Sequence, residues 1–399
     1  MSLTPGNLRV RAAGLLGVGC VVSLLGCGAP EHPPRLFDDH DASSVALDSA
    51  VGGFDVAPDV ATLSCSAGEE AGIVCACREI AQVPPTLYIL FDVSGSMSQR
   101  VGAAAETKWE QIRYALLREP GGVLRPLGGR LGIGAAVFPG PGAGCNPGNE
   151  VFPVTVGSPV AYDDLANRLR VILPDGATPT AHSIHVLAGG LEARKGPVYL
   201  LLATDGAPNC GSAPCSADRC SYDIEGARLT DGTPCTPPLN CCDPAKVPGG
   251  MGWGACVDSA ATLAEVTALH TAGVTTFVVG VPGTEAYASD LDALAVAGGA
   301  PRALSPRYYA ATDATSLADG LRAIAGKVVS SCTITLDAPV DDPGVTNVLL
   351  DGTLVPQDPT NGWTFSDREH IELHGTACQR VTDGVGRLQV AVGCKTITR

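Results

Sequence analysis

Three oxygen-bearing side chains stand at alternate positions directly after an apolar stretch of the chain. The stretch covers residues 86–92 and ends in Asp92, and Ser94 and Ser96 follow it. Carboxylate and hydroxyl oxygens are hard donors that suit Mg²⁺, Ca²⁺ or Mn²⁺ better than Zn²⁺. Gly95, between the two serines, lets the chain curl around a centre. Such strings also form turns and helix caps, so the motif alone is modest support for a metal site.

Two further groups, distant in the chain, extend this oxygen-rich set. Residues 176–180 (GATPT) open a predicted helix, and Asp205 follows the apolar residues 198–204. Asp92 and Asp205 therefore both follow predicted buried strands. In an open α/β sheet, ligands bind beyond the carboxyl ends of the strands, so this edge is where a site is expected.

The ordered set resembles the metal-ion-dependent adhesion site of the von Willebrand factor type A (VWA) family, which includes integrin inserted domains and many bacterial surface proteins. The resemblance covers about residues 84–331 and assigns the metal-binding positions to Asp92, Ser94, Ser96, Thr178 and Asp205. Thr178 is preferred to Thr180 because the family's Thr directly follows the turn of small residues. The resemblance implies a divalent cation, Mg²⁺ before Ca²⁺ or Mn²⁺, with an open coordination position that accepts a carboxylate from a protein partner.

Hydrophobic periodicity predicts the elements that must position these residues. Apolar runs predict buried strands at residues 86–92, 130–138, 198–204 and 274–281, with a short edge strand at 151–156. Helical periods predict helices over residues 108–119, 163–173, 180–194, 257–272, 290–297 and 316–329. Strands that alternate with helices predict an α/β fold with a doubly wound, mostly parallel sheet flanked by helices.

The sequence departs from compact VWA domains in a long insertion, residues 206–256, which contains seven cysteines. Because the insertion starts at Asp205, it must emerge at the metal face, and loops of this length are usually functional. It is either a specificity rim or lid beside the metal, or a stabilising decoration held by disulfides. Cys145 is a candidate eighth member, and the adjacent Cys241 and Cys242 are each expected to pair elsewhere.

The first 26 residues resemble the signal peptide of a bacterial lipoprotein. Arg9 and Arg11 precede an apolar stretch that is too short to span a bilayer. Residues 24–27 (LLGC) resemble a lipobox, in which Cys27 would be lipidated and anchor the chain to the membrane. The alternative is a plain secretory signal with a chance cysteine. Gly28, rather than Asp, follows the cysteine, which favours the outer membrane by the same resemblance.

Composition agrees with an exported protein. Residues 27–63 are rich in Asp, Ala, Pro and Ser and predict a flexible acidic tether. The sixteen cysteines indicate disulfides rather than zinc thiolates, because regular C-x-x-C pairs are missing. A net charge of −15 argues against a nucleic-acid partner, since phosphate binding needs clustered Lys and Arg.

Residues 332–399 change to short alternating runs that predict a small β-module with a hairpin turn at Asp351-Gly352. Its cysteines and those of residues 64–83 could staple the two segments to the body; they are Cys65, Cys75, Cys77, Cys332, Cys378 and Cys394. His370 and His374 share a strand face with Glu372, where a solvated polar face is favoured over a metal site. His182 and His185 are interpreted as surface helix residues.

The first functional interpretation is a binding module and not an enzyme. A Mg²⁺-dependent hydrolase of the phosphoryl-transfer type also places an Asp after its first strand, but it resembles a D-x-D start, and Ser94 takes the second acidic position here. A structural envelope protein, in which the metal only supports a loop, is the other alternative. A nucleotide cofactor is not expected, because neither G-x-G-x-x-G nor a P-loop follows the first strand.

Overall fold

The computed structural model describes residues 78–398 except 81, 143, 212, 246–251, 383–387, 394 and 397. The signal peptide with Cys27, the tether, and Cys65, Cys75, Cys77 and Cys394 lie outside these residues. None of the helices within the described ranges has the length and apolar character that crossing a membrane requires.

A six-stranded sheet forms the centre of the α/β body, in the order β5-β4-β3-β6-β7-β8. Five strands are parallel, namely β3 (Thr86–Asp92), β4 (Gly132–Phe138), β6 (Val198–Thr204), β7 (Val274–Gly280) and β8 (Tyr309–Ala310). The edge strand β5 (Asn149–Val156) is antiparallel to β4. Strands β3 and β6 are direct neighbours, with Phe91 opposite Ala203, so the chain leaves both strands at adjacent points of one edge.

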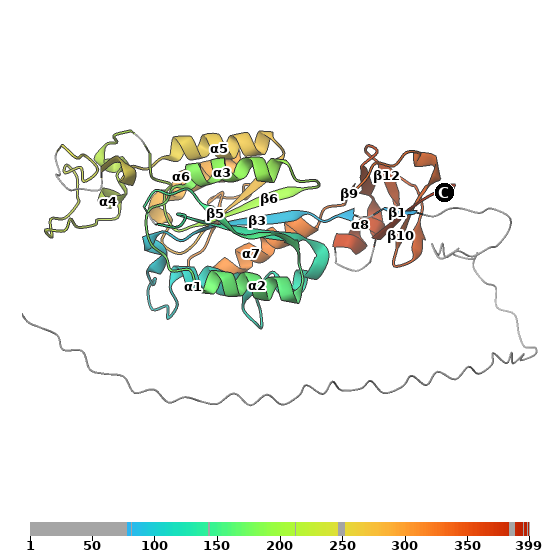
Figure 1. Cartoon of the computed structure of the whole chain (residues 1–399), viewed down its shortest axis with the longest axis horizontal. Coiled ribbons are helices and arrows are strands. Elements are labelled where there is room, and N and C mark those ends of the chain that lie inside the picture. The colour runs from blue at the N-terminus through green and yellow to red at the C-terminus, as the bar shows by residue number, and fades with distance from the viewer. Residues whose placement is uncertain are drawn as a thin grey trace, which may run out of the picture. The chain divides into compact units, whose positions relative to one another are not determined.

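Helices cover both faces of this sheet (Figure 1). One face carries α1 (Lys108–Leu117), α2 (Pro159–Arg170) and α7 (Ala314–Val329), and the other carries α3 (Thr180–Glu192), α5 (Ser259–Thr271) and α6 (Ala288–Ala297). Successive side chains of a strand point to opposite faces. Leu87, Ile89 and Phe91 of β3 therefore enter one apolar core, and Tyr88 and Leu90 enter the other.

The predicted α/β class is confirmed, with a sheet of mixed strand direction. The expected strands at residues 86–92 and 198–204 have the predicted bounds. The helix predicted at residues 163–173 begins earlier, at Pro159, because Ser158 caps its N-terminus and proline suits the first helical turn. The two-residue strand β8 has no periodicity to detect and was not expected.

The C-terminal residues supply three strands to each of two antiparallel four-stranded sheets, which enclose one apolar core. Their elements are β9 (Thr333–Leu336), β10 (Thr346–Leu350), β11 (Thr353–Val355), β12 (Trp363–Phe365), β13 (His370–Leu373), α8 (Gly375–Thr382) and β14 (Leu388–Val392). The hairpin turn predicted at Asp351-Gly352 is confirmed, since both residues have positive φ, 52° and 76°, between β10 and β11. Helix α8 was not expected in a β-module.

Two short strands that precede the α/β body also belong to these sheets. Strand β1 (Arg78–Ile80) pairs with β14, and β2 (Gln82–Val83) pairs with β9. The module is therefore built from chain segments on both sides of the α/β body. A disulfide between Cys332 and Cys378 joins the start of the C-terminal segment to α8.

The cysteine-rich insertion lies between β6 and α5 and contains the short helices η3 (Ala217–Arg219), α4 (Ser221–Ile224) and η4 (Gly252–Ala255). Three disulfides close it internally, and they join Cys215 to Cys256, Cys220 to Cys242, and Cys235 to Cys241. Five of its six fully buried core members are cysteines, so disulfides take the place of an apolar core here. Other short 3₁₀ helices among the described residues are η1 (Gly95–Ser98), η2 (Arg125–Arg130), η5 (Glu285–Tyr287) and η6 (Pro343–Val345).

Two expectations about cysteine pairing are confirmed. Cys241 and Cys242 do not bond to each other. Cys145 is the eighth member, because it bonds to Cys210 and so fastens the β4–β5 loop to the first residues of the insertion.

Candidate metal site

Three loops meet where β3 and β6 end, and backbone hydrogen bonds fasten them together. The Asp175 amide donates to the Val93 carbonyl at 2.8 Å, and the Gly95 amide donates to the Gly176 carbonyl at 3.0 Å. These bonds hold the loop before α3 against the turn that follows β3. The sequence motif is thereby brought beside the residues that lead to Thr178.

The two acidic residues of the predicted set share one network of side-chain hydrogen bonds. Ser96 Oγ donates to Asp205 Oδ1 at 2.8 Å, and the Ser94 and Ser96 hydroxyl oxygens are 3.1 Å apart. Asp92 Oδ1 accepts from the Ser94 amide at 2.8 Å, and Asp92 Oδ2 accepts from Thr204 Oγ1 at 2.6 Å. Side chains that are more than a hundred residues apart in the chain therefore meet at one sheet edge.

The electrostatics of this edge are unfavourable for two free carboxylates. The Asp92 side chain is fully buried, and burial together with the negative charge of Asp205 raises the pKa of Asp92 to about 7. Hydrogen bonds from Ser94 and Thr204 act in the opposite direction and do not cancel the rise. Two buried carboxylates that repel each other are costly unless a cation lies between or beside them.

Lys108 supplies one such positive charge, and the sequence interpretation missed it. Its Nζ lies 2.7 Å from Asp205 Oδ2, and the two side chains are only 7% and 0% exposed. Lys108 is the first residue of α1, where the helix dipole disfavours a cation. A buried lysine at a helix N-terminus needs a nearby anion, but its burial is visible only in the structure, so the sequence offered no signal for this contact.

Thr178 lies on the adjoining loop and is buried. Its amide donates to Asn209 Oδ1 at 2.7 Å, and its carbonyl accepts from the Asn209 amide at 2.9 Å. Asn209, which stands four residues after Asp205, thus fixes the threonine and was not predicted. The Thr180 hydroxyl points back to the Thr178 carbonyl at 3.4 Å, whereas the Thr178 hydroxyl makes no hydrogen bond to any described residue.

The donor set fits a hard divalent cation. Asp92, Ser94, Ser96 and Asp205 offer carboxylate and hydroxyl oxygens within one network, and Thr178 adds a hydroxyl on the neighbouring loop. Oxygen-only donors of this kind suit Mg²⁺, Mn²⁺ or Ca²⁺. These five residues would hold the ion, which would supply a Lewis-acid centre able to bind a further carboxylate.

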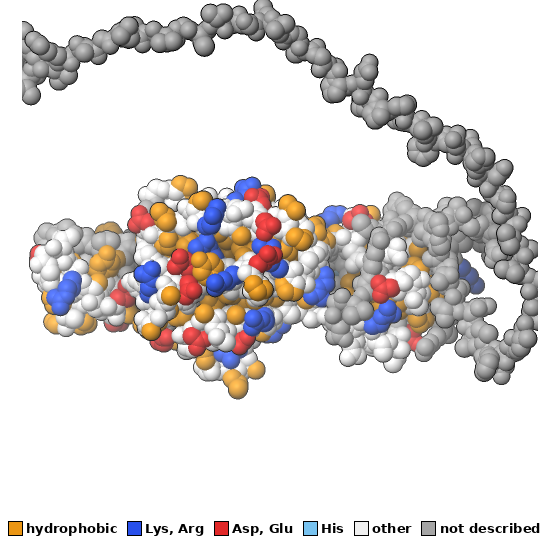
Figure 2. Space-filling model, turned by 90° about the horizontal axis from the view of Figure 1, so that it is seen from below, with side chains coloured by type: hydrophobic (Ala, Val, Ile, Leu, Met, Phe, Trp, Pro, Cys, Tyr) orange, Lys and Arg blue, Asp and Glu red, His pale blue; other side chains and the backbone are white. Residues whose placement is uncertain are grey.

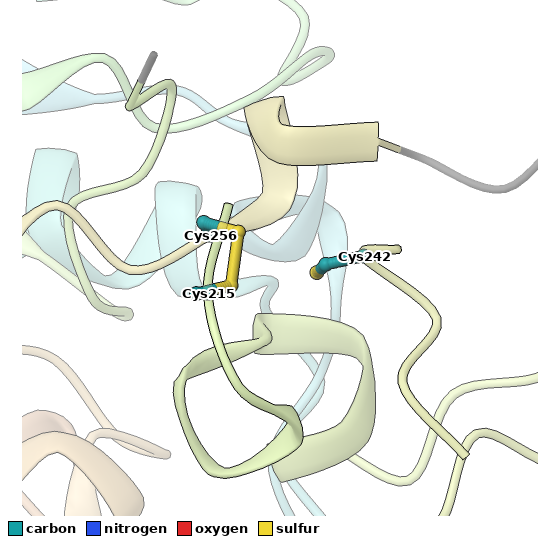
Figure 3. A group of neighbouring side chains, drawn as sticks. All are labelled: Cys215, Cys242 and Cys256. Atoms are coloured by element: carbon teal, nitrogen blue, oxygen red, sulfur yellow. A yellow bond between two sulfur atoms is a disulfide. The ribbon is translucent and has the colours of Figure 1, made fainter. Parts of the chain in front are cut away.

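A second group of potential ligands, all sulfur, does not fit a metal. The Sγ atoms of Cys215, Cys242 and Cys256 lie within 4.8 Å of one another (Figure 3). Cys215 is bonded to Cys256, and Cys242 is bonded to Cys220, so none of these sulfurs is the free thiolate that a metal requires. The expectation of disulfides in place of metal thiolates holds for this cluster.

The histidines that the sequence singled out have separate partners. His370 Nδ1 lies 2.8 Å from Asp367, and His374 Nε2 lies 2.7 Å from Thr364 Oγ1. His185 is exposed on α3, and its Nδ1 lies 3.2 Å from Oε1 of Glu265 on α5. These contacts support the interpretation of ordinary surface histidines.

Comparisons with known proteins give only distant similarities. No known protein family and no curated protein matches the chain. The pilus adhesin SpaC from Lactobacillus rhamnosus GG is 14% identical over 78% of this chain and 39% of its own, with a TM-score of 0.42. The PilB minor pilin from Streptococcus sanguinis is 17% identical over 62% of each chain, with a TM-score of 0.42. The chain thus spans less than two thirds of either pilus protein. The conserved hypothetical protein BatB from Bacteroides thetaiotaomicron is 13% identical over 62% of this chain and 100% of its own, with a TM-score of 0.38.

Proposed function

We propose that residues 84–331 are a VWA-like domain with a doubly wound sheet that binds a protein partner through a divalent cation. Mg²⁺ is the favoured ion, and its ligands are Asp92, Ser94, Ser96, Thr178 and Asp205. One coordination position is left for a carboxylate of the partner, and the ion is the bridge. The proposed role is adhesion or protein binding, without catalysis.

One observation carries this proposal. Asp92 and Asp205 lie at the ends of adjacent strands and are buried at one edge. They are linked through Ser94, whose amide donates to Asp92 and whose hydroxyl lies 3.1 Å from that of Ser96, and through the Ser96 hydroxyl, which donates to Asp205. Lys108 is the counter-charge of Asp205, whereas Asp92 accepts only from the neutral Ser94 amide and Thr204 hydroxyl among the described residues. A buried carboxylate without a counter-charge is costly unless a cation is held beside it. Because two carboxylates do not saturate a divalent ion, the ion retains affinity for a third.

The surface charge supports a protein partner over a nucleic acid. On the face seen in Figure 2, Lys and Arg side chains are interspersed with Asp and Glu and form no continuous basic area there. The chain as a whole carries a net charge of −15. Phosphate backbones are bound by clustered positive charge.

The proposed location follows from the sequence of the N-terminus. Lipidation of Cys27 would anchor the chain to the bacterial envelope, with the outer membrane favoured, and residues 27–63 would serve as the tether. Acyl chains hold a protein at a membrane through the burial of their CH₂ groups. A tethered body is suited to contact partners at or near that membrane.

Metal binding by variants of Asp92 tests the proposal. Isothermal titration calorimetry with Mg²⁺ and Mn²⁺ should show one site in the unaltered chain and no measurable site in Asp92→Ala or Asp92→Asn. Asp92→Asn preserves the shape of the buried side chain, so loss of binding there is not explained by a collapsed fold. Asp319→Ala removes an exposed carboxylate from α7 and is the matched control, which should bind normally.

A second measurement tests the partner's role. Capture of envelope proteins by the immobilised chain should disappear with a chelator and return with Mg²⁺. Metal uptake by Asp92→Asn equal to that of the unaltered chain would refute the site assignment. Capture that survives chelation would favour the structural alternative, and turnover of a phosphatase substrate would favour the hydrolase.

A further inference from the structure

We propose that Lys108 is a built-in cation that competes with the divalent ion for Asp205 and so lowers the affinity of the site for metal. The inference rests on the proposed function, because it concerns the same five ligands. Lys108 lies outside that set, and its charge would determine how tightly the five ligands bind the metal ion.

The contacts of Asp205 carry the inference. Oδ1 accepts a hydrogen bond from Ser96, and Oδ2 is paired with Lys108 Nζ at 2.7 Å. Both oxygens of this carboxylate are therefore engaged. A cation that approaches Oδ2 meets the ammonium group and must displace it or share the oxygen with it.

Lys108 is held in this position by its surroundings. The Lys108 amide donates to the Gln99 carbonyl at 2.9 Å, and Thr107 and Glu110 form a capping box around the first turn of α1. Gly283 faces the ammonium group, and a Cβ at that position would lie 3.0 Å from Nζ. The lysine thus fills a space that a larger residue at position 283 would narrow.

The charge balance gives the direction of the effect. Asp92 and Asp205 each carry a negative charge when ionised, and the carboxyl of Glu225 also lies close enough to interact with Asp205 and Lys108. Lys108 reduces the local negative charge by one. A positive charge beside the ion weakens its binding, and in a buried setting a single charge changes the affinity by on the order of tenfold or more. The same ammonium offsets the repulsion of the carboxylates when no metal is bound.

Calorimetric titration of the whole chain with Mn²⁺ tests the inference. Lys108→Met removes the charge, and Lys108→Gln removes the charge but keeps a hydrogen-bond donor for Asp205. Both should bind Mn²⁺ about tenfold more tightly or better. Lys108→Arg keeps the charge and should stay near the unaltered affinity. Lys395→Met removes an equal charge from an exposed position of the C-terminal segment and should also stay unchanged.

Thermal unfolding supplies a second readout. In the presence of a chelator, Lys108→Met should melt at a lower temperature than the unaltered chain, because the buried Asp205 carboxylate loses its counter-charge. Saturating Mn²⁺ should raise its melting temperature by more than it raises that of the unaltered chain. If Lys108→Met does not fold, both the Mn²⁺ titration and the thermal melt are made with Lys108→Gln.

The outcomes separate the inference from the proposed function. If the unaltered chain binds Mn²⁺ and the Met and Gln variants bind it equally or more weakly, the lysine only positions Asp205 and the inference fails alone. If none of the proteins binds Mn²⁺, both the proposed function and the inference are wrong. Binding by the uncharged variants alone supports the inference and shows that the ammonium occupies the place of the metal.

Discussion

Single residues at the candidate metal site differ in how their charge is balanced. Asp205 has an ammonium group within 2.7 Å, whereas Asp92 receives only neutral hydrogen bonds from Ser94 and Thr204. Both side chains are buried, and burial together with the charge of Asp205 raises the pKa of Asp92 to about 7. In the absence of metal, a proton on Asp92 is therefore the substitute for a cation.

This protonation predicts that the metal-free protein loses stability as the pH rises. An unfolded aspartate has a pKa near 3.9, so between about pH 4 and pH 7 the native state binds a proton that the unfolded state does not. Raising the pH through this window removes that contribution, on the order of 2–4 kcal/mol. The melting temperature in chelator should fall between about pH 4 and pH 7, and Mg²⁺ should restore more stability at the higher pH.

Asp92→Asn is the control for this pH dependence. The neutral amide cannot titrate, so its melting temperature should change much less over the same pH range. Carboxyl groups with lowered pKa, such as those of Glu110 and Asp313, lose their contribution at lower pH and do not act in this window. An equal fall in both proteins would assign the effect to another group.

At the scale of elements, the start of α1 determines where Lys108 lies. Thr107 accepts from the Glu110 amide, and Glu110 accepts from the Thr107 amide, which is a reciprocal capping box. Helix α7 begins with a similar arrangement formed by Asp313 and Ser316. Both caps satisfy the N-terminal backbone amides of their helices, but only the cap of α1 lies next to the candidate metal site.

This pair of caps gives a matched prediction. Thr107→Ala and Asp313→Ala should each lower the free energy of unfolding by about 1 kcal/mol, because each leaves a helix N-terminus without its cap. Thr107→Ala should also change the Mn²⁺ affinity, since the first turn that carries Lys108 becomes looser. Asp313→Ala should leave that affinity unchanged. Urea unfolding and calorimetry measure the two effects, and an unchanged affinity in Thr107→Ala would separate the cap from the site.

The elements were largely predictable from the sequence, because buried parallel strands and amphipathic helices leave clear periods. Strands β3 and β6 have the predicted bounds, and the hairpin at Asp351-Gly352 was signalled by residues that tolerate positive φ. The pairing of β1 and β2 with strands more than 250 residues later was not predictable. Such pairing depends on tertiary contacts, and strands of two or three residues show no pattern.

The candidate site was predictable only in part for a related reason. Motif spacing indicated the oxygen ligands, whose types reveal their chemistry. Lys108 acts through its contact with Asp205, and Asn209 acts through two hydrogen bonds to the backbone of Thr178. Such long-range contacts leave no local pattern, so these residues emerge only when the loops are placed in space.

At the scale of the whole molecule, the division of the apolar cores indicates which parts can fold alone. The two cores that flank the central sheet draw on residues between Leu87 and Val328. The core of the C-terminal sheets draws on residues between Ile334 and Val390. The α/β body thus completes its own cores, whereas the C-terminal sheets also need β1 and β2 for edge pairing.

This division predicts different fates for two fragments. Residues 84–331 should fold alone, unfold cooperatively, and bind Mn²⁺ within about threefold of the whole chain, because every proposed ligand and both cores are retained. Residues 332–399 should lack a stable fold, because they lose β1, β2 and the bond from Gln82 Nε2 to the Leu388 carbonyl, 2.6 Å long. Adding residues 78–83 to that segment through a short linker should restore cooperative unfolding. Circular dichroism and thermal melts distinguish the cases; an aggregated or molten 84–331 fragment would mean that the C-terminal sheets are required for the body to fold.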